Sequence, residues 1–172
     1  MTSVREARQA RRRRDAAAAR YRPQTVELLL IAEAPPGALD RYFYFADVSD
    51  QDSLFRHVVR ALLGVEPSRT EKADQLNCLA DRGVFLTDLK LEPKLEGETL
   101  EDYVADLVAR AVELRPRHVI TIKANVCDLV QPALRAAGLD VLDQRIPFPG
   151  SGQQRRFLQT MGDALDSIGW RR

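Results

Sequence analysis

The sequence predicts an α/β fold in which a four-stranded parallel sheet is flanked by helices. Short apolar runs alternate with longer stretches whose apolar residues recur every three or four positions, as in strands and amphipathic helices. The first run, Thr25–Ala32, is almost continuously apolar, which is typical of a parallel strand covered on both faces. The chain has 172 residues, of which 45% are hydrophobic, and this is enough for one domain with its own core.

The predicted elements follow one another as strand, two helices, strand, helix, strand, helix, strand and helix. Right-handed crossovers between the parallel strands are expected for this order. The strands are expected at Thr25–Ala32, Val84–Leu89, His118–Ile122 and Leu139–Ile146. The helices are expected at Asp52–Leu63, Arg69–Ala80, Leu100–Leu114, Ala124–Ala137 and Ser151–Ile168.

Residues 1–22 are expected to form a basic helix or arm, and residues 23–172 the α/β domain. Ser3–Arg20 is rich in Ala and Arg, which favour helices. The arm carries eight arginines against only Glu6 and Asp15. Such an arm can neutralise several phosphates and give a salt-dependent affinity for nucleic acid. It can equally be a solvated helix that needs no partner.

The cysteine pattern and the hydropathy exclude several classes of protein. Cys78 and Cys127 stand alone, so neither a disulfide framework nor a zinc or iron–sulfur cluster is indicated, and no cofactor or metal is expected. No apolar stretch approaches the roughly 20 residues that span a bilayer, and the N-terminal segment lacks the apolar part of a secretory signal. These features predict a cytoplasmic protein without a membrane partner and leave its oligomeric state open.

Two loops rich in Pro and Gly, residues 32–37 and 147–152, follow predicted strands. Ligands of open α/β sheets bind at the carboxyl ends of the strands, so both loops are expected to face one crevice. Glycines let backbone N–H groups approach an anion, and the helix that follows the second loop adds its dipole. A phosphate site is therefore expected at Gly150, Ser151, Gly152, Arg155 and Arg156, with Lys123 at its rim. The alternative is a simple turn that caps the last helix.

Four segments between about Val26 and Leu165 resemble, in order, the uracil-DNA glycosylase superfamily. They are Leu28–Pro36 (LLLIAEAPP), Gly83–Lys90, His118–Ile122 and Pro147–Phe157, the last resembling the loop usually written HPSP. The resemblance implies a three-layer sandwich with a four-stranded parallel sheet between helices. It also implies a DNA-binding enzyme that extrudes a damaged or deaminated base, in single-stranded or lesion-containing DNA, and hydrolyses its N-glycosidic bond.

The resemblance assigns two acidic residues to the site. Glu33 takes the place of the residue that orients water or stabilises positive charge on the sugar, although it can also simply brace its own loop. Asp88 stands where the family usually has an Asn that reads the base. An ionised Asp only accepts hydrogen bonds, so it suits a base edge rich in donors. The alternatives for Asp88 are an ion pair with Lys90 and a cap on a neighbouring loop.

Aromatic residues are expected to contact the base. The family places an aromatic platform near Tyr42–Phe45, and Tyr44 or Phe45 is the expected platform, although at least half of this cluster is expected to fill the core. Phe148 stands where the family has a His that stabilises the leaving base. Because Phe donates no hydrogen bond, uracil excision of the usual kind is placed in doubt.

Three functions therefore remain. The first is an atypical glycosylase in which Glu33 assists water. The second is a non-catalytic module of the same fold that binds nucleic acid or a nucleotide. The third is a scaffold whose basic arm docks on an acidic partner.

Overall fold

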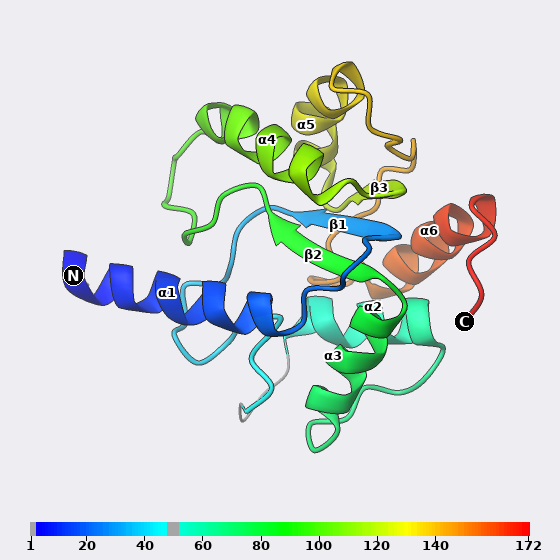
Figure 1. The fold of residues 1–172 in the computed structure, drawn as a ribbon, viewed down its shortest axis with the longest axis horizontal. Helices are drawn as coiled ribbons and strands as arrows, with labels where there is room; N and C mark the ends of the chain where they lie inside the picture. Colours follow the sequence, from blue (N-terminus) through cyan, green and yellow to red (C-terminus); the bar gives the residue numbers. More distant parts are fainter. Residues whose placement is uncertain (1–2, 48–51) are drawn as a thin grey trace.

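A parallel β-sheet lies between two layers of helices in the computed structural model, which describes residues 3–47 and 52–172 (Figure 1). Its strands are β1 (Leu28–Ala32), β2 (Val84–Asp88) and β3 (His118–Thr121), in the order β2-β1-β3. Both neighbours run parallel to β1, whose final residue Ala32 aligns with Asp88. The prediction of an α/β fold with a helix-flanked parallel sheet is confirmed.

The sheet has three strands, and the expectation of a fourth at Leu139–Ile146 is wrong. This segment meets β3 and the residue after it through two isolated parallel bridges, Val119 to Val141 and Ile122 to Ile146. Between the bridges, Asp143 and Arg145 are exposed and form ion pairs with Arg135 and Asp128 of the preceding helix, residues 124–136. The pairing with β3 is thus limited to the two bridges, and no continuous ladder forms.

The helices divide between the two faces of the sheet (Figure 1). On one side lie α4 (Val104–Leu114), preceded by the short 3₁₀ helix η1 (Glu101–Tyr103), and α5 (Ala124–Ala136). On the other side lie α1 (Val4–Arg20), α2 (Ser53–Leu63), α3 (Lys72–Asp81) and α6 (Gln154–Ser167).

Local chemistry fixes several helix ends. The Asp52 carboxylate accepts a hydrogen bond from the Phe55 backbone N at 2.6 Å and so caps α2, which ends at Gly64 in the left-handed conformation. Ser3 and Glu6 form a reciprocal capping box at the start of α1. These caps satisfy backbone groups that a helix cannot pair internally.

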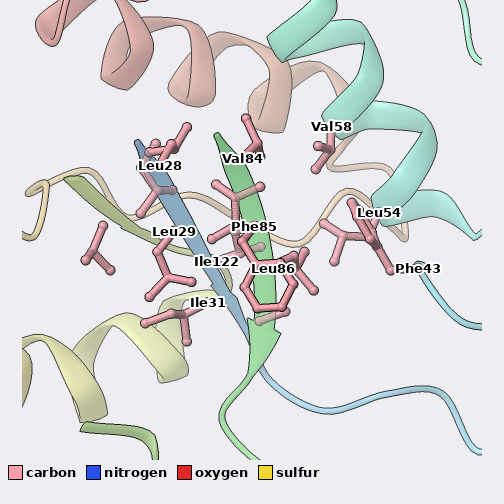
Figure 2. Packing of buried hydrophobic residues seen from close by; sticks show 14 of the residues in the cluster. Leu28, Leu29, Ile31, Phe43, Leu54, Val58, Val84, Phe85, Leu86 and Ile122 are labelled. Atoms are coloured by element: carbon pink, nitrogen blue, oxygen red, sulfur yellow. The ribbon is translucent and has the colours of Figure 1, made fainter. Parts of the chain in front are cut away.

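The core surrounds the sheet on both faces. All five residues of β1 are buried, as the continuous apolar run predicts. Figure 2 shows Leu54 and Val58 of α2, with Phe43, next to the side chains of β2. Burying one such Leu, Val or Phe side chain contributes about 1.5–3 kcal/mol to folding.

The N-terminal helix α1 packs against the rest of the chain. Its cap residue Tyr21 is buried and stacks on Tyr44, with ring centroids 6.2 Å apart. Arg11 pairs with Glu92, and the buried Arg14 reaches the Leu91 carbonyl at 3.4 Å. The basic helix therefore packs against fixed neighbours, and Arg11 and Arg14 on its inner face contact them.

Candidate functional site

A cavity of about 410 Å³ opens at the carboxyl ends of the strands. Both loops expected to face one crevice contribute to it, the first through residues 33–36 and the second through Phe148. Residues from the segment before α2 and from its first turn complete the walls. The polar and aromatic residues of the lining are Glu33, Arg41, Tyr42, Phe43, Asp52, Ser53, Asp88, Lys123 and Phe148.

Glu33 lies directly after β1 and is held by two donors. Lys123 Nζ donates to its Oε1 and Asn125 Nδ2 to its Oε2, each at 2.8 Å. Burial favours the neutral form, but the hydrogen bonds from Asn125 and Lys123 outweigh it and lower the pKa of Glu33 below its ordinary value. Glu33 is therefore an ionised carboxylate at neutral pH, fixed in orientation at the cavity wall.

Lys123 reaches Glu33 from an unusual backbone conformation. Its φ is 81°, in the region that favours glycine, at the junction between β3 and α5. Its backbone N also donates to the Ile146 carbonyl at 2.7 Å. A non-glycine residue in such a conformation commonly marks a functional position. The ion pair with Glu33 is one specific contact that this conformation serves.

Asp88 ends β2 and is 4% exposed. Among the described residues, no side chain or backbone group hydrogen-bonds its carboxylate. Burial, and secondarily the nearby Asp52, raise the pKa of Asp88 to about 7, against the opposing effect of Arg110 and Arg14. Asp88 is thus neutral in a large fraction of molecules at neutral pH. In that state it offers both a donor and an acceptor to a ligand in the cavity.

Lys90 does not pair with Asp88. Its ammonium lies 2.6 Å from Glu98 Oε2, and the Tyr103 hydroxyl donates to the same carboxylate at 2.7 Å. This excludes one of the structural alternatives for Asp88. The Asp88 carboxylate therefore faces the cavity without an ion pair to Lys90.

The aromatic cluster is arranged differently from the expectation. Tyr44 lies in the core, where its hydroxyl donates to the Leu86 carbonyl at 3.0 Å and accepts from the Leu86 N. Phe45 lies under the Arg13 guanidinium, 4.4 Å from the ring centroid. Neither residue lines the cavity, whose aromatic lining residues in the described part of the chain are Tyr42, Phe43 and Phe148. All four rings are largely buried.

Phe148 and the glycine-rich loop lie together at the rim. Phe148 is 43% exposed, and a Cβ on Gly150 would come within 3.1 Å of its ring. The Ser53 hydroxyl donates to the Pro149 carbonyl and ties this loop to α2. Ser151 and Gly152 both have positive φ. Ser151, Gly152, Arg155 and Arg156 are exposed and do not line the cavity.

Sequence reasoning missed three charged residues beside the cavity. Asp52, which was expected only as the start of a helix, and Arg41 both line it. The buried Lys72 donates to the Tyr42 carbonyl at 3.2 Å and lies 4.5 Å from the centroid of Phe55. Burial lowers the pKa of Lys72 to about 8, although Asp52 partly opposes it. The Asp that precedes a helical pattern was a recognisable cap, but nothing local placed it at the cavity.

Within residues 3–47 and 52–172, no cluster of three or more His, Cys, Asp or Glu side chains has an arrangement that could hold a metal ion. No helix in the same ranges is long and apolar enough to cross a membrane. No protein-family model matches the chain, and no curated protein matches its sequence.

Proposed function

We propose that the chain binds an extruded base of DNA in this cavity and hydrolyses the N-glycosidic bond of a damaged or deaminated base, as a divergent relative of the uracil-DNA glycosylases. The observation that carries the proposal is the fixed, ionised Glu33 in the wall of a cavity that is also lined by Tyr42, Phe43 and the buried Asp88.

Glu33 has the properties that this hydrolysis requires. When the bond between the sugar C1′ and the base nitrogen breaks, its electron pair leaves with the base and positive charge develops on the sugar. An ionised carboxylate stabilises that charge and orients a water molecule. The water oxygen then bonds to C1′ and its proton passes to solvent. Lys123 and Asn125 position Glu33 but leave further lone pairs on its oxygens for the water.

Asp88 and the aromatic rings account for recognition of the base. Tyr42 and Phe43 offer ring surfaces for stacking, which every base can use. The unpartnered Asp88 carboxyl distinguishes bases by their edges, because its neutral form both donates and accepts a hydrogen bond. We therefore expect binding of the base to change between about pH 6 and pH 8, as Asp88 titrates.

A non-catalytic base-binding module is the second candidate. It is favoured by Phe148, an apolar ring at the rim where the resemblance calls for a donor to the leaving base. Without that donor, a base that leaves as an anion is poorly stabilised. A protein of this kind binds the base with the same cavity and recognition groups but does not hydrolyse the glycosidic bond.

The test is a single-turnover incubation of excess protein with labelled single- and double-stranded oligonucleotides that carry uracil, hypoxanthine, xanthine or a mismatch. Alkaline cleavage then reveals abasic sites. We expect Glu33→Gln to slow base release about a hundredfold or more. The matched control is Glu113→Gln, an exposed position on α4, which should cleave as the wild type does.

The outcomes separate the candidates. Equal strand breakage by the wild type and Glu33→Gln would remove Glu33 from the chemistry. No breakage on any substrate, together with lesion-dependent binding that Asp88→Ala weakens, would assign the non-catalytic module.

A further inference from the structure

A second cavity, of about 250 Å³, lies between α1 and the segment of residues 38–45. Three arginines line it: Arg13 and Arg14 on α1, and Arg41 on the facing segment. Arg41 also lines the first cavity, so the two cavities share a wall. Of the arginines in the described part of α1, Arg13 and Arg14 therefore line this cavity and the others do not.

Arg14 is buried, and its guanidinium is poorly satisfied by the residues that the structure describes. It is 5% exposed, and its buried Nε has no hydrogen-bond partner among those residues. Its one hydrogen bond to a described residue is the long contact of Nη2 with the Leu91 carbonyl, at 3.4 Å. No carboxylate in the described ranges pairs with it. A buried guanidinium in this state is costly unless an anion reaches it. The charge of Arg14 acts on Asp88 and partly opposes the rise of its pKa, but the two side chains form no ion pair.

The other two arginines frame the same space. The Arg13 guanidinium is held over the Phe45 ring and donates to the Leu39 carbonyl at 3.2 Å. Arg41 is exposed and makes no hydrogen bond or ion pair with a described residue, although its charge acts on the buried Asp52 of the first cavity. Arg13 is likewise without an ion pair there. Two of the three guanidinium groups are thus fixed by the fold, and the third is available to close on a ligand.

One carboxylate shares the lining. Glu6 contributes to this cavity, but it accepts a hydrogen bond from the Ser3 backbone N at 2.7 Å as part of the capping box of α1. The lining thus has three guanidinium groups and one carboxylate, which is already bonded within the capping box. The cavity is therefore strongly cationic. Its donors come in planar forks, the arrangement that binds phosphate oxygens in pairs.

We propose that this second cavity is a phosphate-binding site in which Arg13, Arg14 and Arg41 are the donors. The proposal goes beyond the proposed function, because binding of a phosphate here does not depend on hydrolysis in the first cavity. When the phosphate belongs to a DNA strand, the shared Arg41 places it beside the nucleotide whose base enters the first cavity. A free nucleotide presents the same phosphate chemistry.

Binding of a labelled, lesion-free single-stranded oligonucleotide tests the site, with fluorescence anisotropy at several salt concentrations. We expect Arg13→Gln and Arg41→Gln each to weaken binding about five- to tenfold and to lower the salt slope by about one. Arg14→Lys keeps the charge but removes the fork, and it should also weaken binding. The matched control is Arg12→Gln, an exposed arginine of α1 that does not line the cavity, which should change binding no more than about twofold. The melting temperature of each variant verifies that it is folded.

Calorimetry with inorganic phosphate and with a deoxynucleoside monophosphate identifies the source of the phosphate. Weakened oligonucleotide binding in the cavity variants supports a strand. Stoichiometric binding of the monophosphate that is lost in Arg13→Gln, with oligonucleotide binding unchanged, supports a free nucleotide. Equal weakening by Arg12→Gln and Arg13→Gln, or no effect of any cavity variant on any probe, would overturn the site. Loss of base release in Glu33→Gln with phosphate binding intact would show that the two cavities act separately.

Discussion

Lys123 Nζ lies 2.8 Å from Glu33 Oε1, although 90 positions separate the two residues in the sequence. Glu33 follows β1 and Lys123 follows the neighbouring β3, so the parallel pairing of the strands brings them to one edge of the sheet. Lys123 makes this contact with a φ of 81°. In this pair, the carboxylate of Glu33 is fixed and the backbone of Lys123 is strained.

Replacing Lys123 separates the ion pair from the strain. Lys123→Ala loses the ammonium and keeps an unfavourable φ, whereas Lys123→Gly loses the ammonium and relieves the φ. We expect the free energy of unfolding of the Gly variant to exceed that of the Ala variant by about 1 kcal/mol. Urea unfolding of both variants measures this difference. A less stable Gly variant would mean that the conformation of Lys123 is not strained.

Asp88→Asn is expected to stabilise the protein in a pH-dependent manner. The unfolded chain loses the Asp88 proton near pH 3.8, whereas the folded chain keeps it to about pH 7. Stability of the wild type therefore falls as pH rises through this window, because unfolding releases a proton. Asn cannot ionise, so the advantage of the variant should grow between pH 4 and pH 7 and stay constant above, reaching about 1–4 kcal/mol.

Urea unfolding of the wild type and Asp88→Asn at pH 4.5, 6 and 8 measures this advantage. Asp163→Asn, at an exposed position of α6, is the matched control and should show no such trend. An advantage that is the same at all three pH values would contradict the raised pKa of Asp88.

Gly83 is expected to tolerate no side chain. It precedes β2 with a φ of 76°, and an added Cβ would lie 2.8 Å from Glu27 Cγ and 2.9 Å from both the Glu27 N and the Thr25 carbonyl oxygen. Two of these atoms are backbone and cannot move without disturbing the start of β1. We expect Gly83→Ala to lower the free energy of unfolding by about 2–4 kcal/mol.

The control for Gly83 isolates the contribution of the contacts. Gly97 has a similar φ of 70° but no atom within 4 Å of an added Cβ. Gly97→Ala should therefore cost only the conformational strain, about 1 kcal/mol. Chemical denaturation of both variants measures the difference, and equal losses would show that the crowding at Gly83 relaxes freely.

The sequence predicted the parts of the fold that depend on local patterns. A continuous apolar run marked β1, and the helical spacing of apolar residues in Asp52–Leu63 marked α2, in which Asp52 is the cap and not the first residue. The prediction of a strand at Leu139–Ile146 failed because its apolar residues resemble a strand, whereas the segment meets β3 at only two isolated bridges. Asp143 and Arg145 pair with α5, which no local pattern reveals.

The site was predicted where it depends on strand ends and missed where it depends on the path of loops. Glu33 and Asp88 follow or end strands, so their place at one edge of the sheet was foreseeable. The arrangement of Tyr42–Phe45 was not foreseeable, because side chains alternate between two faces only where the backbone is extended. The segment turns instead, with the Phe45 N donating to the Tyr42 carbonyl at 3.0 Å, and all four rings become buried.

If the chain is a glycosylase as proposed, Phe148→His tests whether the cavity lacks only a donor to the leaving base. Phe148 lines the cavity and is 43% exposed, so a His side chain can occupy its place with little change in packing. Its ring N–H can hydrogen-bond a base oxygen that gains negative charge as the glycosidic bond breaks. We expect single-turnover release of uracil to rise at least about tenfold over the wild type. Phe148→Leu, which changes the shape without adding a donor, should not show this rise. If the His and Leu variants released uracil at the same rate, the ring at this position would not face the leaving group, and the match of this loop to the HPSP segment would lose its support.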